Sequence, residues 1–150
     1  MNASHMTQRP IYFIRRALLL AAGAFTFAVM SSAAQAGDLI LNVEGRQGRD
    51  AALHIALFTV GNFLKKPEVE RVAEAGATQV VFYGLQPGRY AATAYLDLNG
   101  NRTLDRNPFG APLEPVAISN DAVGLMGPPA FEAASFEVGT DAASFTLHLP

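Results

Sequence analysis

Leu85 to Asp105, which reads LQPGRYAATAYLDLNGNRTLD, is the stretch that decides the fold. Its Pro87-Gly88 pair predicts a type II turn, in which glycine takes the positive φ that other residues resist. From Tyr90 to Leu96 the apolar and small side chains predict a strand. This strand stops at Asp97, and oxygen-bearing side chains then recur at alternate positions. A turn, a strand and a polar loop in direct succession are typical of a β-protein.

The polar loop has the ligand spacing of a calcium site. A Ca²⁺ ion takes six to eight oxygens, and a chain curled around it offers alternate side chains, a carbonyl near the seventh place and another group near the ninth. Here these would be the side chains of Asp97, Asn99, Asn101 and Asp105 and the carbonyl of Thr103. Because only two of these groups are carboxylates, we expect weak binding, with a Kd on the order of 10⁻⁴ to 10⁻³ M.

Two positions depart from the helix-loop-helix calcium motif. Arg102 stands in the sixth place, where the motif has glycine, and Pro108 in the twelfth, where it has a bidentate Glu. Glu114, further along the chain, is a candidate for an additional oxygen. The alternative is a polar turn without a metal, since Asn, Asp and Gly cluster in turns.

Residues 1–36 have the pattern of a secretory signal peptide. A basic n-region with three arginines precedes an apolar h-region at 17–29, and Ala34-Gln35-Ala36 is a small-x-small cleavage site. We expect cleavage after about Ala36 and a periplasmic or secreted bacterial protein. The h-region is too short to span a bilayer core of about 30 Å, so no transmembrane segment is expected to be retained.

Residues 37–150 are predicted to form one domain, which is long enough for a core of its own. This part has eight basic and thirteen acidic residues, a net charge of −5, and no basic patch. Nucleic-acid binding is therefore excluded, and an anionic lipid surface would repel the domain. The chain has no cysteine, so its stability must come from core burial and from any bound cation.

Alternating apolar and polar residues predict further short strands on both sides of the opening stretch. We expect strands at 39–44 and 53–58 that pair as a hairpin, a strand at 78–83, and strands at 136–138 and 144–149 that pair as a closing hairpin. Residues 67–75 fit either a short helix or a strand, and 111–134 form a long irregular connection with four prolines. Short strands between Gly and Pro turns predict an all-β fold, a single antiparallel β-sandwich of about seven strands.

Several motifs in combination resemble a known family. They are Leu85-Gln86-Pro87-Gly88-Arg89-Tyr90-Ala91, Asp97-x-Asn99-Gly100-Asn101-x-x-Leu104-Asp105-x-Asn107, Gly110-x-Pro112-x-Glu114, Ser119-Asn120 and Gly127-Pro128-Pro129-x-Phe131-Glu132. Their order resembles DUF2141, a family of exported bacterial domains of unknown function, over essentially the whole of residues 37–150. The resemblance implies a transthyretin-like or immunoglobulin-like sandwich and export, and it implies no activity. The family usually has His before the first Asp of the loop, where this chain has Leu96, and a glycine-rich approach to Ser-Asn where it has Pro115 to Ile118.

These observations favour a non-catalytic module with a binding or structural role in the cell envelope. Its partner would be an envelope protein, a peptide or a glycan. The candidate contact residues are Ser119, Asn120, Pro128, Pro129 and Phe131. The alternative for Pro128, Pro129 and Phe131 is that they seal one end of the sandwich.

A small secreted hydrolase is the second functional class. Its candidate residues are Asp97, Asp105 and Glu114, because paired carboxylates can act as acid and base. The sequence has no Gly-x-Ser-x-Gly elbow and no thiol. His54 and His148 lie in predicted strands without a nucleophile motif, so we expect structural or solvated roles for both.

Overall fold

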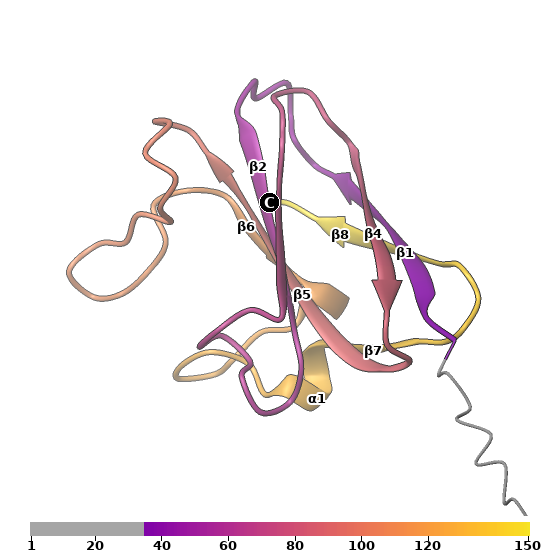
Figure 1. Cartoon of the computed structure of the whole chain (residues 1–150). Coiled ribbons are helices and arrows are strands. Elements are labelled where there is room, and N and C mark those ends of the chain that lie inside the picture. The colour runs from indigo at the N-terminus through magenta and orange to yellow at the C-terminus, as the bar shows by residue number, and fades with distance from the viewer. Residues whose placement is uncertain (1–34) are drawn as a thin grey trace, which may run out of the picture. The chain divides into compact units, whose positions relative to one another are not determined.

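The computed structural model describes residues 35–150, and the predicted h-region lies outside them. Eight strands form two sheets that pack as a sandwich (Figure 1). The strands are β1 (Gly37–Glu44), β2 (Ala52–Phe58), β3 (Val69–Ala73), β4 (Gln79–Leu85), β5 (Gly88–Asp97), β6 (Val116–Ile118), β7 (Ser135–Val138) and β8 (Ala143–His148). A 3₁₀ turn, η1 (Ser119–Asp121), and one helical turn, α1 (Phe131–Ala134), lie between β6 and β7. The predicted all-β sandwich is confirmed.

The two sheets differ in size and in strand direction. The smaller sheet has the order β4-β1-β8, in which β1 is antiparallel to β4 and parallel to β8. The larger sheet has the order β3-β2-β5-β6 and is antiparallel throughout. In this sheet β7 pairs with the first half of β5, on the edge that β6 occupies further along. The strand β5 therefore has β2 along one side and two short strands along the other.

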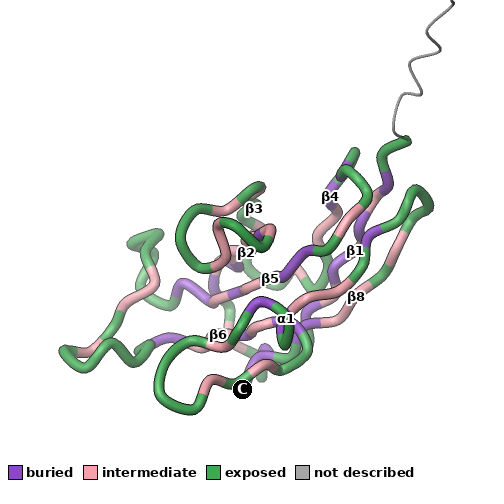
Figure 2. Tube along the Cα trace, turned by 90° about the horizontal axis from the view of Figure 1, so that it is seen from below, coloured by how far each residue is buried: buried purple, intermediate pink, exposed green. Residues whose placement is uncertain are grey.

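The core lies between the sheets and is built by alternation along the strands. In β1 the side chains of Leu39, Leu41 and Val43 are buried, and in β2 those of Leu53 and Ile55. Figure 2 shows this alternation along the strands and the exposed chain of the long connections. The buried cluster extends from Leu39 to Leu149, so residues 35–150 contain a complete core. In this part of the chain, no helix has the length and apolar character that crossing a membrane requires.

Both predicted hairpins are wrong. The strands β1 and β2 lie in different sheets, and so do β7 and β8. The connection after β1 carries the chain across the sandwich, and the buried guanidinium of Arg46 holds it there. Arg46 donates to the carbonyls of Ala77, Arg49 and Ala51 at 2.9, 3.3 and 2.7 Å. Because these bonds fix an arch between the sheets, the two strands do not pair with each other.

The Pro87-Gly88 pair also differs from its prediction. Gly88 has φ 159°, which is close to extended backbone and far from the roughly +80° of a type II turn. It is the first residue of β5, and the bend at Pro87 links β4 in one sheet to β5 in the other. The stretch 67–75, which fitted either a helix or a strand, contains the edge strand β3. The connection at 111–134, which was predicted to be irregular, contains the short elements β6, η1 and α1.

Candidate functional site

The Asp97 loop, residues 97–105, begins where β5 ends and projects from the sandwich (Figure 1). Asp97 is only 4% exposed, and its carboxylate accepts three backbone N–H groups from the loop. Its Oδ1 accepts from Gly100 at 2.8 Å and from Asn101 at 3.1 Å, and its Oδ2 accepts from Arg102 at 2.7 Å. The chain is therefore curled around the side chain that opens the loop.

A second buried carboxylate, from the segment that follows the loop, also bonds to the backbone of the loop. Glu114 is 7% exposed, and its Oε1 accepts from the Leu98 N–H at 2.8 Å. Its Oε2 accepts from the Asp105 N–H at 3.2 Å. Asp97 and Glu114 together thus satisfy five N–H groups between Leu98 and Asp105. Hydrogen bonds to ionised acceptors are the stronger kind, so the two carboxylates define the backbone shape of the loop.

Side chains at the third, fifth and ninth places of the loop converge. The Asn99 amide donates to Asp105 Oδ2 at 2.6 Å, and the Asn101 amide lies 3.1 to 3.2 Å from both Asp105 oxygens. The amide oxygens face the backbone: Asn99 Oδ1 accepts from the Asn101 N–H at 3.0 Å, and Asn101 Oδ1 from the Thr103 N–H at 2.8 Å. Alternate polar side chains are therefore gathered on one side of the loop, as their spacing predicts.

Arg102 occupies the place where the calcium motif requires glycine, and its backbone has the corresponding shape. Its φ is 63°, in the left-handed region that non-glycine residues rarely enter. The charge-assisted bond from its N–H to Asp97 holds this conformation. Arg102 therefore adopts the left-handed conformation for which the motif uses glycine.

The carboxyl of Asp97 is held in its ionised form. Desolvation by burial acts to raise its pKa, but the N–H donors of Arg102, Gly100 and Asn101 and the nearby His54 act against it. The pKa of Asp97 consequently lies below its ordinary value of 3.8. An acceptor that stays ionised at neutral pH suits both the folding of the loop and the binding of a cation.

His54 is a neighbour of the loop that the sequence did not identify. Its Nε2 lies 3.5 Å from Asp97 Oδ2, and its ring stacks on Tyr95 with 4.7 Å between the ring centroids. Tyr95 is the cross-strand partner of His54 in the pairing of β2 with β5. The only signal that could have placed His54 here is the register of these strands, because 43 positions separate His54 from Asp97 in the sequence.

The predicted partner contacts fall into two groups. Ser119 is fully buried; its Oγ accepts from the Ala92 N–H at 2.9 Å and donates to the Ala134 carbonyl. Asn120 donates its amide to the carbonyls of Ala133 and Ser135 at 3.1 and 2.9 Å. These two side chains are engaged in holding α1 against β5, which leaves them little surface for a partner.

The other group lies at the end of the connection that leads to α1. Phe131 is only 6% exposed and packs edge-on against Phe63 at 5.7 Å. This burial agrees with the alternative that Phe131 seals the sandwich. Pro129 is half-buried, and Pro128 is exposed.

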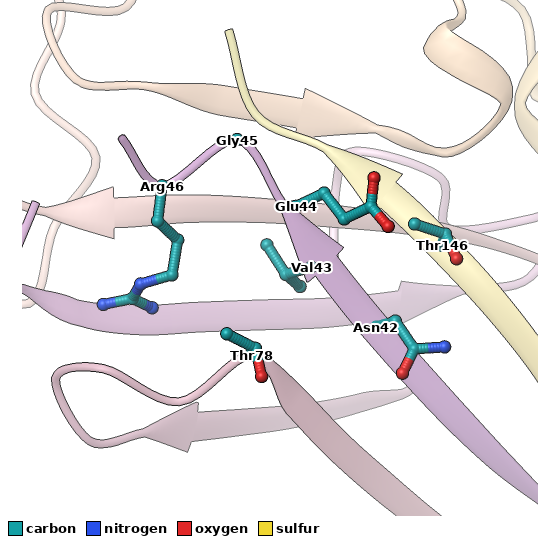
Figure 3. Close-up of a pocket in the computed structure, with 7 residues that line it drawn as sticks. All are labelled: Asn42, Val43, Glu44, Gly45, Arg46, Thr78 and Thr146. Atoms are coloured by element: carbon teal, nitrogen blue, oxygen red, sulfur yellow. The ribbon is translucent and has the colours of Figure 1, made fainter. Parts of the chain in front are cut away.

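A hollow elsewhere in the described chain has no comparable arrangement of side chains. Its volume is about 440 Å³, and Figure 3 shows it over β1, lined by Asn42, Glu44, Arg46, Thr78 and Thr146 among others. The side chains of Glu44 and Arg46 point in different directions there. The Arg46 guanidinium is already bonded to three carbonyls, so its charge is not offered to a ligand.

The possible metal ligands of the loop are of several chemical types. Within residues 35–150, no three side chains of His, Cys, Asp or Glu come together as a metal-binding group. A cation in the Asp97 loop would therefore depend on amide and carbonyl oxygens as well as carboxylates. Calcium is the common cation that accepts such a set, because it binds neutral oxygens in flexible geometry.

A comparison with known protein families identifies the family of this chain. A family model described as an uncharacterized protein conserved in bacteria (DUF2141) matches residues 41–146. The chain belongs to the DUF2141 family. The match runs from β1 to β8 and includes the whole Asp97 loop, so the predicted resemblance is confirmed for this DUF2141 chain. No curated protein and no solved structure matches it.

Proposed function

We propose that this DUF2141 protein is an exported, non-catalytic β-sandwich module whose Asp97 loop binds calcium weakly. Its role would be in binding or structure in the periplasm or on the outer face of a bacterial envelope. The observation that carries the proposal is the convergence of Asn99 and Asn101 on Asp105, within a loop that Asp97 has already curled. A cation would replace the two amide N–H groups as the partner of the Asp105 carboxylate.

The remaining ligands follow from the same geometry. The carbonyl of Thr103 belongs to the seventh place, where calcium loops use a backbone oxygen. Asp97 Oδ1 already accepts two N–H groups and Oδ2 accepts one, so a single lone pair of Oδ2 remains for a cation, since each carboxylate oxygen can accept two bonds. Glu114 is a less direct candidate, because each of its oxygens already fixes one end of the loop.

Export is supported by the pattern at the start of the chain. The first strand begins at Gly37, the residue that follows the predicted cleavage site. The leader can therefore be removed without loss of any residue of the sandwich. An exported protein meets calcium at concentrations that suit a weak site, in the range of extracellular modules.

The carboxylates of the hydrolase alternative are placed unfavourably for catalysis. Asp97 and Glu114 are buried, and both oxygens of each accept backbone N–H groups. An acid or base must reach the proton that it transfers, and these two carboxylates face the backbone of the loop. Only Asp105 is accessible, so the pair that hydrolysis would require is not offered to a substrate.

Thermal unfolding of residues 35–150 in EDTA and in calcium tests the metal site. Calcium at ten times its Kd stabilises a folded state that alone binds it by about 1.4 kcal/mol. For a domain of this size we expect the Tm to rise by about 5 °C. The rise should disappear in Asp105→Ala and remain in the control Asp141→Ala, which removes an exposed carboxylate outside the loop. An equal Tm of the parent protein in EDTA and in about 10 mM calcium would contradict the site, because that concentration exceeds the expected Kd.

A further inference from the structure

The outer face of the larger sheet is covered at both ends and open in the middle. At one end Phe63 and Phe131 pack with Ala91, whose side chain is on the outer face. At the other end the Asp97 loop closes over the edge of β2 and β5. Between them is a hollow of about 140 Å³, lined by residues of β2, β3 and β5 and by Arg102 of the loop. We call this the outer-face hollow.

The strand register explains how the hollow forms. Ala56 of β2 lies opposite Thr93 on one side and Glu70 on the other, and its small side chain forms a low floor. The next outward position on β2 is His54, which stacks on Tyr95 with an angle of 15° between the rings. The larger side chains of His54, Glu70, Thr93 and Tyr95 therefore surround Ala56 and form the walls of the hollow.

The walls carry hydrogen-bonding groups that the fold does not use. His54 Nε2 is buried and has no hydrogen-bond partner, although Asp97 Oδ2 lies 3.5 Å from it. Four more polar side chains line the hollow and have no hydrogen-bond or ion-pair partner among the described residues: Glu70 and Arg102, which are exposed, and Thr93 and Tyr95, which are half-buried. A buried polar atom is ordinarily paired, so the unpaired Nε2 of His54 beside these donors and acceptors points to a ligand.

The chemistry of these groups selects the class of ligand. Glu70 offers a carboxylate acceptor, Arg102 a fork of donors, and the Thr93 and Tyr95 hydroxyls can donate or accept. An anion would be repelled by Glu70, and a cation by Arg102 and by Arg71, which also lines the hollow, whereas a neutral polyhydroxyl compound can bond to groups of either charge. The volume is well below the roughly 300–1,000 Å³ of sites for drug-sized molecules, so only one small ring fits.

From this combination we propose that the outer-face hollow binds a single sugar unit of an envelope glycan. The site deepens the binding role proposed above, but it rests on the side chains of the hollow and not on calcium. The Asp97 loop would contribute to this site, because it positions the Arg102 side chain at the rim of the outer-face hollow. A cation that fixes the loop would fix this donor as well.

Nuclear magnetic resonance titration of ¹⁵N-labelled residues 35–150 tests the site. The probes are D-glucose, D-galactose and N-acetyl-D-glucosamine in the millimolar range. We expect at least one of them to shift the amide signals of His54, Thr93 and Tyr95 in a saturable manner. Absence of shifts with all three sugars, or shifts confined to the hollow over β1, would overturn the proposal.

Two variants and one control give the test its specificity. Arg102→Gly removes the guanidinium while easing the positive φ, and Tyr95→Val removes the phenol with a residue that suits a strand. Each should raise the sugar Kd about tenfold, as loss of a hydrogen bond to a charged group or of a ring contact does. Tyr83→Val on β4, which removes an exposed tyrosine of the other sheet, should leave the Kd unchanged. Equal affinity of the parent protein and both hollow variants would overturn the assignment.

Repeating each titration in EDTA and in calcium separates this proposal from the metal site. Arg102→Gly keeps the loop N–H that bonds Asp97, so it should still gain Tm in calcium while losing sugar affinity. Asp105→Ala should lose the calcium effect and still bind sugar, because Asp105 does not line the hollow. Sugar binding without any calcium effect would refute the metal site alone, and a calcium effect without sugar binding would refute the hollow alone.

Discussion

At the scale of single residues, Asp97 joins the sheet to the loop. As the last residue of β5 it has a fixed position, and its carboxylate accepts the N–H groups of three successive loop residues. An ionised acceptor strengthens each of these bonds. The folded loop therefore depends on the charge of Asp97 as well as on its shape.

This dependence predicts a loss of stability in acid. The pKa of Asp97 is lowered on folding, so between the folded and unfolded values the unfolded chain binds the proton and stability rises with pH. Its contribution is complete above the ordinary value of 3.8 and is lost as the pH falls through the lower folded value. We expect the urea midpoint to fall below pH 4 more steeply in the parent protein than in Asp97→Asn, which does not titrate. Parallel profiles of the two proteins would contradict this role.

The residues of the loop also mark a limit of sequence-based prediction. The spacing of Asp97, Asn99, Asn101 and Asp105 was sufficient to predict that their side chains gather, because the pattern is local. The contact between His54 and Asp97 was not predictable, since it depends on which strand pairs with β5 and in which register. The role of Glu114 as a clamp depends likewise on the path of the chain after the loop.

At the scale of elements, one backbone N–H of β5 is bonded to a side chain where no neighbouring strand reaches it. Along one edge it pairs with β7 through Ala91 and with β6 from Thr93 onward. Ala92 lies at the junction, and its N–H donates to the Ser119 hydroxyl instead of to a strand. The same hydroxyl donates to the carbonyl of Ala134 at the end of α1. Ser119 therefore links β6, β5 and α1 at a point where the ladder is interrupted.

Replacement of this hydroxyl should weaken the junction. Ser119→Ala leaves a buried N–H and a buried carbonyl without partners, which costs about 1–3 kcal/mol. We expect a lower urea midpoint and faster hydrogen exchange at the Ala92 amide. Ser144→Ala is the control, because Ser144 is bonded to Asn42 at an exposed position and its loss should change the midpoint little. Unchanged exchange at Ala92 in Ser119→Ala would show that the hydroxyl does not protect the junction.

At the scale of the whole molecule, the alternation of side chains predicted the strands and the sandwich but not their pairing. The pattern in Leu39, Leu41 and Val43 identifies a buried face without naming the neighbouring strand. Adjacent strands were expected to form hairpins, whereas β1 pairs with β4 and β8. The arch held by Arg46 decides this, and its three carbonyl partners are distributed between two connections. Such bonds become visible only once the chain is folded.

The parallel pairing of β8 with β1 closes the smaller sheet and makes the last residues part of the core. Leu147 is 1% exposed and lies opposite Val43, whereas its neighbour His148 is on the outer surface and contacts Asp121 at 3.2 Å. Leu147→Ala should reduce the free energy of unfolding by about 2–5 kcal/mol, a large part of the roughly 5–15 kcal/mol of a typical domain. His148→Ala removes two exposed pairs, with Asp121 and with Glu44, each worth about 0–1 kcal/mol. Urea unfolding of both variants of residues 35–150 tests the contrast. If the two substitutions cost the same, β8 does not contribute to the core, and the sandwich is closed by β4 and β1 alone.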